Sequence, residues 1–461
     1  MVRPKAIILI TIDCLRYDFG SELRSYNFNA PSIFFSRVFS TGPHTRISFQ
    51  SIFSGVYPYI MNYNTPNFAD KIMFLSKVLK QFNFIRIGTS GNNVFLSRYF
   101  GFDRYFDVFL DSIPSSNINT LKYNRIVASN LHQSGNIDIP NPILFILRQK
   151  VNSIENPLLE SAMKLIYALL LLCGKSEVLP IIDSARYLKV LLPFIVKNVK
   201  ARENLFVWIH MMDLHVPYTL VIRHKYNLHK IAYVKLSERG LDNILNLHKK
   251  VIRFYKELYQ EAWGYVKLVL RYFVRFLVEF LESKNYEFII IITSDHGEEL
   301  GEESIVGHQG IVNMRFAIPR LSLHLLHVPL VLITNSDKVL KNFISHEVNE
   351  LRSLVDIAPT VLRWLDLNDK LVRRLSQGIP FMNREEHSFV VAEAEAIIYG
   401  TRPIGRSYTI ILQNNLRLLF NPIDGFKVFR LINNIEREES LSESEIMKLK
   451  EMFTNIIKKH R

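Results

Sequence analysis

An unbroken run of five apolar residues at positions 288–292, four of them isoleucine, is the feature that most constrains how this chain can fold. A strand of this kind must be covered on both faces, as is a central strand of a parallel sheet with helices on either side. The run leads through Thr293 and Ser294 into Asp295 and His296. Because ligands in open α/β sheets bind beyond the carboxyl ends of the strands, we expect both residues at a functional site. A neighbouring carboxylate and imidazole suit a divalent metal, although an isolated acid here can also be a simple turn residue.

A second, almost wholly apolar run at residues 6–12 also ends on a carboxylate, that of Asp13. Two parallel strands that each deliver an acid at the carboxyl end can place those acids side by side. Two carboxylates that close repel each other unless a cation lies between them. The sequence therefore favours a cation site formed by Asp13 and Asp295.

Composition and charge favour some classes of protein over others. The 461 residues include 57 basic and 43 acidic side chains, a net charge of +14 that favours anionic substrates, and no nucleic-acid-binding signature is present. Cys14 and Cys173 are the only cysteines, so we expect no disulfide framework and a reducing, cytoplasmic location. The N-terminus lacks a signal-peptide cleavage pattern, and the apolar run at 165–173 is too short to span a bilayer.

Several motifs occur in an order that resembles one family. A hydroxyl-rich loop at 40–48 leads into a helical pattern that Gly55 and Pro58 close. With it come the following motifs: Asp13-x-x-Arg16-x-Asp18, Gly101-Phe102-Asp103, residues 210–218 (HMMDLHVPY), Ser294-Asp295-His296-Gly297-Glu298, residues 307–310 (GHQG), residues 327–330 (HVPL) and residues 355–360 (VDIAPT). Together they resemble the sulfatase branch of the alkaline phosphatase superfamily over roughly residues 5–430.

The resemblance implies an α/β fold of the alkaline-phosphatase type, a three-layer sandwich with a mostly parallel central sheet and a small antiparallel C-terminal subdomain. We expect a catalytic domain at 1–376, with a family-specific insertion at about 110–200, and the C-terminal subdomain with a terminal helix at 377–461. The pattern also predicts a helix over 70–81, another over 356–365, and a helical segment at 244–283 in two pieces around Gly264.

The resemblance places the nucleophile on Thr45. Sulfatases of this family use a formylglycine made from Cys or Ser, and a threonine cannot give that aldehyde. A threonine alkoxide is instead similar to the phosphoryl-transfer members of the superfamily. Asp13, Thr45, Asp295 and His296 would hold one divalent ion (Ca, Mg, Mn or Zn), whereas Cys14 stands where many sulfatases carry a further metal-binding Asp.

Other residues receive roles from the same resemblance. His215 and His308 are candidate catalytic residues, or with Asp213 they would hold a second ion. Arg16 and Ser48 are candidate substrate-binding residues. Two expectations come from the residues alone: His210 is a buried core histidine, and the acidic residues after His296 are solvated (Glu298, Glu299, Glu302 and Glu303).

These inferences predict a metal-dependent hydrolase or transferase of phosphate or sulfate esters with a threonine nucleophile. Its substrate would be an anionic small-molecule, glycan or lipid ester. The alternative is a catalytically silent, sulfatase-like protein that binds an anionic glycan or lipid, because Ile47 and Phe49 replace the proline and the basic residue that the family's loop usually has. Retention of Asp13, Asp295 and His296 argues for the enzyme.

Overall fold

A computed structural model describes the protein at residues 3–58, 68–91, 93–111, 184–198, 203–215, 248–302, 305–308, 311–312, 316–318, 321–398, 403–422, 425–432 and 435–459. The insertion predicted at about 110–200 therefore lies outside the described residues, apart from its two ends. None of the described helices combines the length and the apolarity needed to cross a bilayer.

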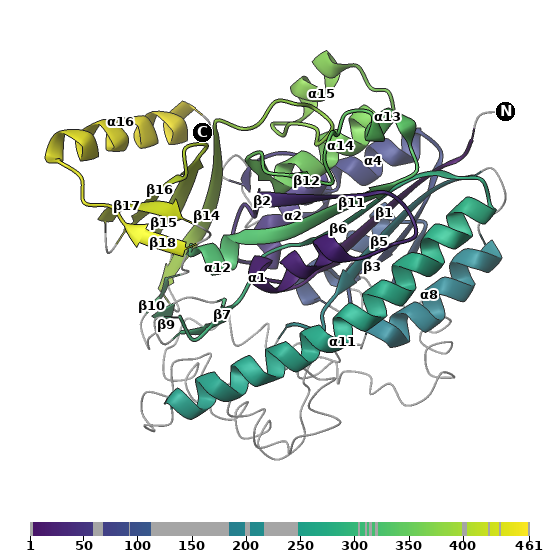
Figure 1. The fold of residues 1–461 in the computed structure, drawn as a ribbon, viewed down its shortest axis with the longest axis horizontal. Coiled ribbons are helices and arrows are strands. Elements are labelled where there is room, and N and C mark those ends of the chain that lie inside the picture. Colours follow the sequence, from purple (N-terminus) through teal and green to yellow (C-terminus); the bar gives the residue numbers. More distant parts are fainter. Residues whose placement is uncertain are drawn as a thin grey trace.

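A mixed, mostly parallel sheet forms the centre of the molecule (Figure 1). β11 runs antiparallel to both of its neighbours, β6 and β2, whereas β6, β1, β5, β3 and β4 are parallel to one another. In spatial order the strands are β12 (Glu347–Val348), β2 (Ser32–Phe39), β11 (His327–Thr334), β6 (Glu287–Ser294), β1 (Lys5–Ile12), β5 (Asn204–Met211), β3 (Phe84–Thr89) and β4 (Val108–Leu110), with β13 (Arg352–Ser353) also paired to β2.

Helices cover both faces of this sheet, as its apolar strands require. Alternate residues of β1 point to opposite faces: Ile8 and Ile10 enter one hydrophobic core, and Ile7 and Leu9 enter the other. The first core is closed by α11 (His248–Ser283) and α8 (Ser184–Asn198). The helices on the second face are α2 (Thr45–Ser54), α3 (Phe68–Ile72), α4 (Phe74–Gln81), α14 (Ile357–Trp364) and α15 (Asp369–Leu375). The predicted three-layer α/β architecture is confirmed.

The C-terminal sheet is separate and antiparallel, and α16 (Glu443–Lys459) packs on it through Phe453 and Ile457. Two of its short strands precede residue 376, so the sheet recruits chain from both sides of the domain boundary predicted there. Its strands in spatial order are β18 (Ile435–Glu438), β17 (Gly425–Ile432), β16 (Leu416–Asn421), β15 (Pro403–Leu412), β14 (Phe389–Ile398), β10 (Phe316–Ile318) and β9 (Ile311–Val312).

Two helix predictions need correction. The helix expected in two pieces around Gly264 is one continuous 36-residue element, α11. Its apolar face is packed along the sheet, and that packing outweighs the intrinsic cost of one glycine, about 1 kcal/mol. Conversely, the single helix expected at 70–81 is interrupted at Met73, whose ψ of 36° leaves the helical range and separates α3 from α4. The remaining short elements are α1 (Tyr17–Gly20), α12 (Leu323–Leu326), α13 (Asp337–Leu340), β7 (Glu299–Leu300) and β8 (Val306–Gly307).

Stability should depend on pH through His327, the first residue of β11. Its ring stacks on Tyr17, with the centroids 3.7 Å apart, and its Nε2 donates a hydrogen bond of 2.8 Å to the Ser36 carbonyl. Burial lowers the pKa of His327 to about 4. The folded protein therefore keeps this imidazole neutral in a pH range where the unfolded chain protonates it, and stability is lost as pH falls from about 6.5 to about 4.

We expect the free energy of unfolding to lose up to about 3 kcal/mol from this residue across that window. The measurement is urea unfolding of the native protein and of a His327→Phe variant at several pH values. The variant keeps an aromatic ring for the stack but has no imidazole to protonate. As pH falls toward 4, the native protein should therefore lose more free energy of unfolding than the variant does. Parallel pH curves would contradict the assignment.

Candidate active site and metal centre

The register of the central sheet brings the two predicted acids together. β1 and β6 are parallel neighbours with Ile12 beside Ser294, so Asp13 and Asp295 leave the same edge of the sheet at the same level. Both carboxylates are fully buried. Burial and the negative charge of Asp13 raise the pKa of Asp295 well above its usual value. For Asp13 burial acts in the same direction, but His215, His210 and His296 outweigh it and hold its pKa well below the usual value.

His296 presents one ring nitrogen to these acids. Its Nδ1 donates a hydrogen bond of 2.8 Å to the Gly297 carbonyl, which leaves the lone pair on Nε2. That nitrogen lies 3.6 Å from Asp13 Oδ1 and 3.6 Å from Asp295 Oδ2. Burial and the neighbouring His308 lower the pKa of His296 to about 4, so the ring is neutral at physiological pH, as a metal ligand must be.

The hydroxyl of Thr45 completes the group. Thr45 is the first residue of α2, and its Oγ1 lies 3.3 Å from Asp13 Oδ2 and 3.3 Å from His296 Nε2. This hydroxyl does not cap the helix, because His44 occupies the N-cap position. The structure thus gathers Asp13, Thr45, Asp295 and His296 at the N-terminus of α2, where the helix dipole favours an anion.

These residues fit a divalent cation. One ligand atom each from Asp13, Asp295 and His296 lies within 4.8 Å of the others. Asp295 Oδ2 is buried and accepts no hydrogen bond from any described residue. A buried carboxylate oxygen without a donor is costly unless a cation is its partner. Two carboxylates, a hydroxyl and a neutral imidazole are donors that Zn²⁺ and other divalent ions accept.

Two residues outside the predicted set of site residues support Asp13. Asn93 donates from Nδ2 to Asp13 Oδ2 at 3.2 Å, and the same nitrogen lies 3.5 Å from Thr45 Oγ1. His210, predicted as a core histidine, is buried, but its Nε2 lies 3.2 Å from Asp13 Oδ2. Its Nδ1 pairs with the Thr11 hydroxyl at 2.9 Å. Asn93 follows β3 at the same sheet edge, so the rule that identified Asp13 and Asp295 could also have found it.

A second group of imidazoles borders this cluster. The ring centroid of His308 lies 4.7 Å from that of His296, 5.2 Å from that of His215 and 5.6 Å from that of His44. His215 and His308 are therefore placed beside the four central residues. Asp213 instead accepts hydrogen bonds from the backbone N–H and the hydroxyl of Ser184, the first residue of α8. A second metal held by Asp213, His215 and His308 stays a prediction.

The acidic residues after His296 are not all solvated, contrary to expectation. Glu298 and Glu299 are fully buried. Glu298 accepts a hydrogen bond of 2.8 Å from the Tyr255 hydroxyl and pairs with His308 Nδ1 at 2.9 Å. Burial by itself would raise the pKa of Glu298, but His308 holds it below the usual value. Tyr255 of α11 thus supports the site through its hydroxyl as well as filling the core with its ring.

Arg16 and Ser48 are engaged elsewhere. The five N–H donors of Arg16 are used by the Asp18 carboxylate, Glu302, the Glu298 carbonyl and His324. The Ser48 hydroxyl is buried and donates to the carbonyls that shape its own loop. Neither side chain has a donor left for a substrate oxygen in this arrangement, so we leave both out of the proposed active site.

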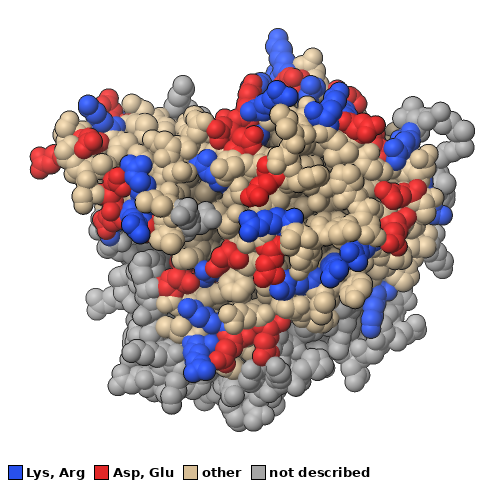
Figure 2. Space-filling model, in the orientation of Figure 1, with Lys and Arg blue, Asp and Glu red and all other residues tan. Residues whose placement is uncertain are grey.

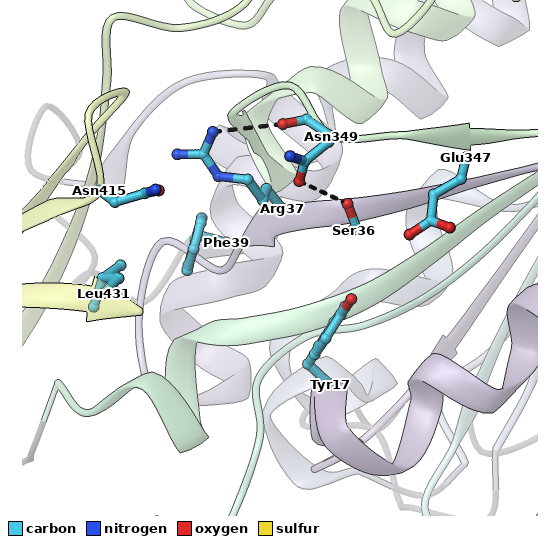
Figure 3. A pocket seen from close by; sticks show the side chains of 8 residues that line it. All are labelled: Tyr17, Ser36, Arg37, Phe39, Glu347, Asn349, Asn415 and Leu431. Atoms are coloured by element: carbon cyan, nitrogen blue, oxygen red, sulfur yellow. Dashed lines mark hydrogen bonds between the residues drawn. The ribbon is translucent and has the colours of Figure 1, made fainter. Parts of the chain in front are cut away.

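A groove of about 450 Å³ lies between the edge of the central sheet and the C-terminal sheet, and none of the cluster residues lines it (Figure 3). Its lining residues are Tyr17, Ser36, Arg37, Phe39, Glu347, Asn349, Asn415 and Leu431. On the face of the molecule in Figure 2, basic and acidic side chains of the described residues are intermixed, without a patch of a single sign.

The sequence model of the sulfatase family matches residues 7–367, which include every member of the central cluster. The chain belongs to the sulfatase family. No curated protein sequence is similar to it at a significant level.

The solved structures of proteins with two different activities resemble this sulfatase-family protein. A phosphonate monoester hydrolase from Silicibacter pomeroyi has a TM-score of 0.59 and 14% identity, with 98% of this chain and 94% of that chain covered. A phosphonate monoester hydrolase from Agrobacterium radiobacter has a TM-score of 0.56 and 14% identity, with 100% and 96% covered. A 2-O GAG sulfatase has a TM-score of 0.59 and 11% identity, with 100% and 93% covered. At such low identity these likenesses show the shared fold alone.

Proposed function

We propose that this sulfatase-family protein is a metal-dependent phosphoryl-ester hydrolase or transferase with Thr45 as its nucleophile. The observation that carries the proposal is the position of the Thr45 hydroxyl, 3.3 Å from both Asp13 Oδ2 and His296 Nε2 at the N-terminus of α2. A threonine cannot supply the aldehyde that formylglycine-dependent sulfatases need. An alkoxide at this position suits attack on phosphorus.

Asp13, Asp295, His296 and Thr45 would hold the divalent ion, which when bound would polarise the ester and favour the threonine alkoxide. The Thr45 hydroxyl gives its proton to water, and Oγ1 attacks the phosphorus in line while the bond to the leaving oxygen breaks. His215 or His308 protonates that oxygen. Water or an acceptor alcohol then attacks the phosphothreonine, returns a proton to the same histidine and frees Thr45. The N-terminus of α2 favours the transferred anion throughout.

Several residues would keep this geometry in place. Asn93 and His210 both contact Asp13 Oδ2 and so fix the position of that carboxylate. Glu298 pairs with His308 Nδ1 and thereby sets which nitrogen of that ring carries the proton. The net charge of +14 supports an anionic substrate.

A substrate panel tests the proposal. The purified full chain, loaded in turn with Zn²⁺, Mn²⁺, Mg²⁺ or Ca²⁺, is assayed with aryl esters of a phosphate diester, a phosphate monoester, a phosphonate monoester and sulfate. We expect kcat/KM for the best phosphorus ester to exceed that for the sulfate ester by at least about tenfold, because a threonine alkoxide suits attack on phosphorus. The phosphate monoester also carries more negative charge than the sulfate ester for the cation to neutralise.

The opposite ranking, with robust sulfate hydrolysis, would contradict the threonine mechanism. No turnover of any ester, with glycan or lipid binding that is indifferent to metal, would favour the silent-binder alternative. The cytoplasmic location stays a prediction, and cell fractionation would test it.

A further inference from the structure

Cys14 is placed unusually for a buried cysteine. It directly follows Asp13 and has a φ of +63°, a left-handed conformation that is unfavourable for a residue with a Cβ atom. The side chain is fully buried, yet its Sγ faces polar atoms: it lies 3.0 Å from Asp13 Oδ1 and 3.7 Å from His308 Nδ1. The backbone conformation thus directs the sulfur toward the ionisable cluster.

Sulfur and nitrogen donors converge at this point. One ligand atom each from Cys14, His296 and His308 lies within 4.8 Å of the others, and all three residues are buried. His296 also belongs to the group formed with Asp13 and Asp295. Since its Nδ1 is hydrogen-bonded to the Gly297 carbonyl, only Nε2 can coordinate, and one lone pair binds one ion. The two groups therefore describe the surroundings of a single cation.

His308 is held as a metal-binding histidine usually is. A carboxylate oxygen of Glu298 lies 2.9 Å from its Nδ1, and the other oxygen of that carboxylate accepts from the Tyr255 hydroxyl at 2.8 Å. A carboxylate that receives one imidazole N–H fixes the tautomer and makes the other nitrogen a better ligand. The buried Glu298 thus has a function in this arrangement, because its carboxylate orients the ring of His308.

We propose that Cys14 is a ligand of the metal and that, with His296 and His308, it makes the site select a thiophilic divalent cation, Zn²⁺ before all, over Ca²⁺ and Mg²⁺. Zn²⁺ accepts thiolate, imidazole and carboxylate together, whereas Ca²⁺ and Mg²⁺ take oxygen ligands almost alone. The thiol gives its proton to solvent as the sulfur–metal bond forms. This inference rests on the metal site of the proposed function and adds the identity of the ion. With His308 as a ligand, His215 is the residue that protonates the leaving oxygen.

Cobalt titration provides a readout that does not depend on activity. The full chain is freed of metal and titrated with Co²⁺, whose bond to a thiolate gives a charge-transfer absorption in the near ultraviolet. We expect this band in the native protein and in a Cys173→Ser variant, and its absence from Cys14→Asp and Cys14→Ser. Cys173→Ser is the matched control because the chain has only these two cysteines.

Competition then measures selectivity. Zn²⁺ should displace Co²⁺ from the native protein and Ca²⁺ should not, whereas in Cys14→Asp the preference for Zn²⁺ over Ca²⁺ should fall by at least about tenfold. Aspartate adopts the left-handed conformation more readily than most residues, so this variant is expected to fold, as circular dichroism would verify. Stoichiometric Co²⁺ binding without the thiolate band would overturn the role of Cys14 and leave the proposed function standing. Failure of the native protein to bind any of these ions would overturn both.

Discussion

Replacement of Thr45 by alanine is expected to lower kcat/KM for phosphorus esters by about 10⁴-fold or more, since loss of a nucleophile removes the covalent route altogether. The fold should be unaffected, because the hydroxyl caps no helix and its hydrogen-bond partners Asp13, His296 and Asn93 belong to the site. Steady-state kinetics and the melting temperature measure the two effects. Mass spectrometry of the acid-quenched native enzyme should show a phosphoryl group on Thr45.

Two controls sharpen this experiment. Thr45→Ser keeps a hydroxyl and should retain part of the activity. Thr41→Ala removes another buried hydroxyl of the same loop, one that makes no hydrogen bond with the described residues, and should change kcat/KM only a few-fold. Undiminished turnover by Thr45→Ala, or equal losses from Thr41→Ala and Thr45→Ala, would remove Thr45 from the mechanism.

The second large effect is expected from Asp295→Asn, which keeps the volume of the side chain and removes its charge. We expect metal affinity to fall by at least about 100-fold, because one of the two carboxylates of the proposed cation site is lost. Turnover at moderate metal concentration should fall with it. Zn²⁺ at 100 times its Kd should stabilise the native protein by about 2.7 kcal/mol, and the same concentration should leave the variant nearly unshifted.

Thermal unfolding with and without metal, together with metal analysis of the purified proteins, measures these changes. Asp18→Asn is a suitable control: it removes the same charge nearby, but its carboxylate is 55% exposed and pairs with Arg16 outside the cluster. That variant should keep the metal-induced shift. An equal shift in Asp295→Asn would mean that the cation lies elsewhere.

The sequence by itself predicted the architecture, and it pointed to Asp13, Thr45, Asp295 and His296 as one group. The runs at 6–12 and 288–292 are apolar at nearly every position, without alternation, so both faces of the sheet must be covered. Parallel strands in such a sheet present their carboxyl ends at one edge. These local facts allow Asp13 and Asp295 to meet, and the pairing of β1 with β6 in the folded sheet brings them together. The position of Thr45 followed from the order of the motifs, which is also a property of the sequence.

Only the tertiary structure decided which residues contact the side chains of the site. The contact of Asn93 with Asp13 joins residues 80 positions apart, and that of Glu298 with Tyr255 joins residues 43 apart. Glutamate is usually solvated, so its residue type predicted an exposed Glu298. The Tyr255 hydroxyl and the His308 imidazole, which satisfy its buried carboxylate, become its neighbours only on folding. In the same way the five hydrogen bonds of the Arg16 guanidinium join it to four residues, three of them remote in sequence (Glu298, Glu302 and His324). Local patterns report which residue types stand at a strand end, whereas hydrogen-bond partners and side-chain direction depend on register and packing across the whole chain.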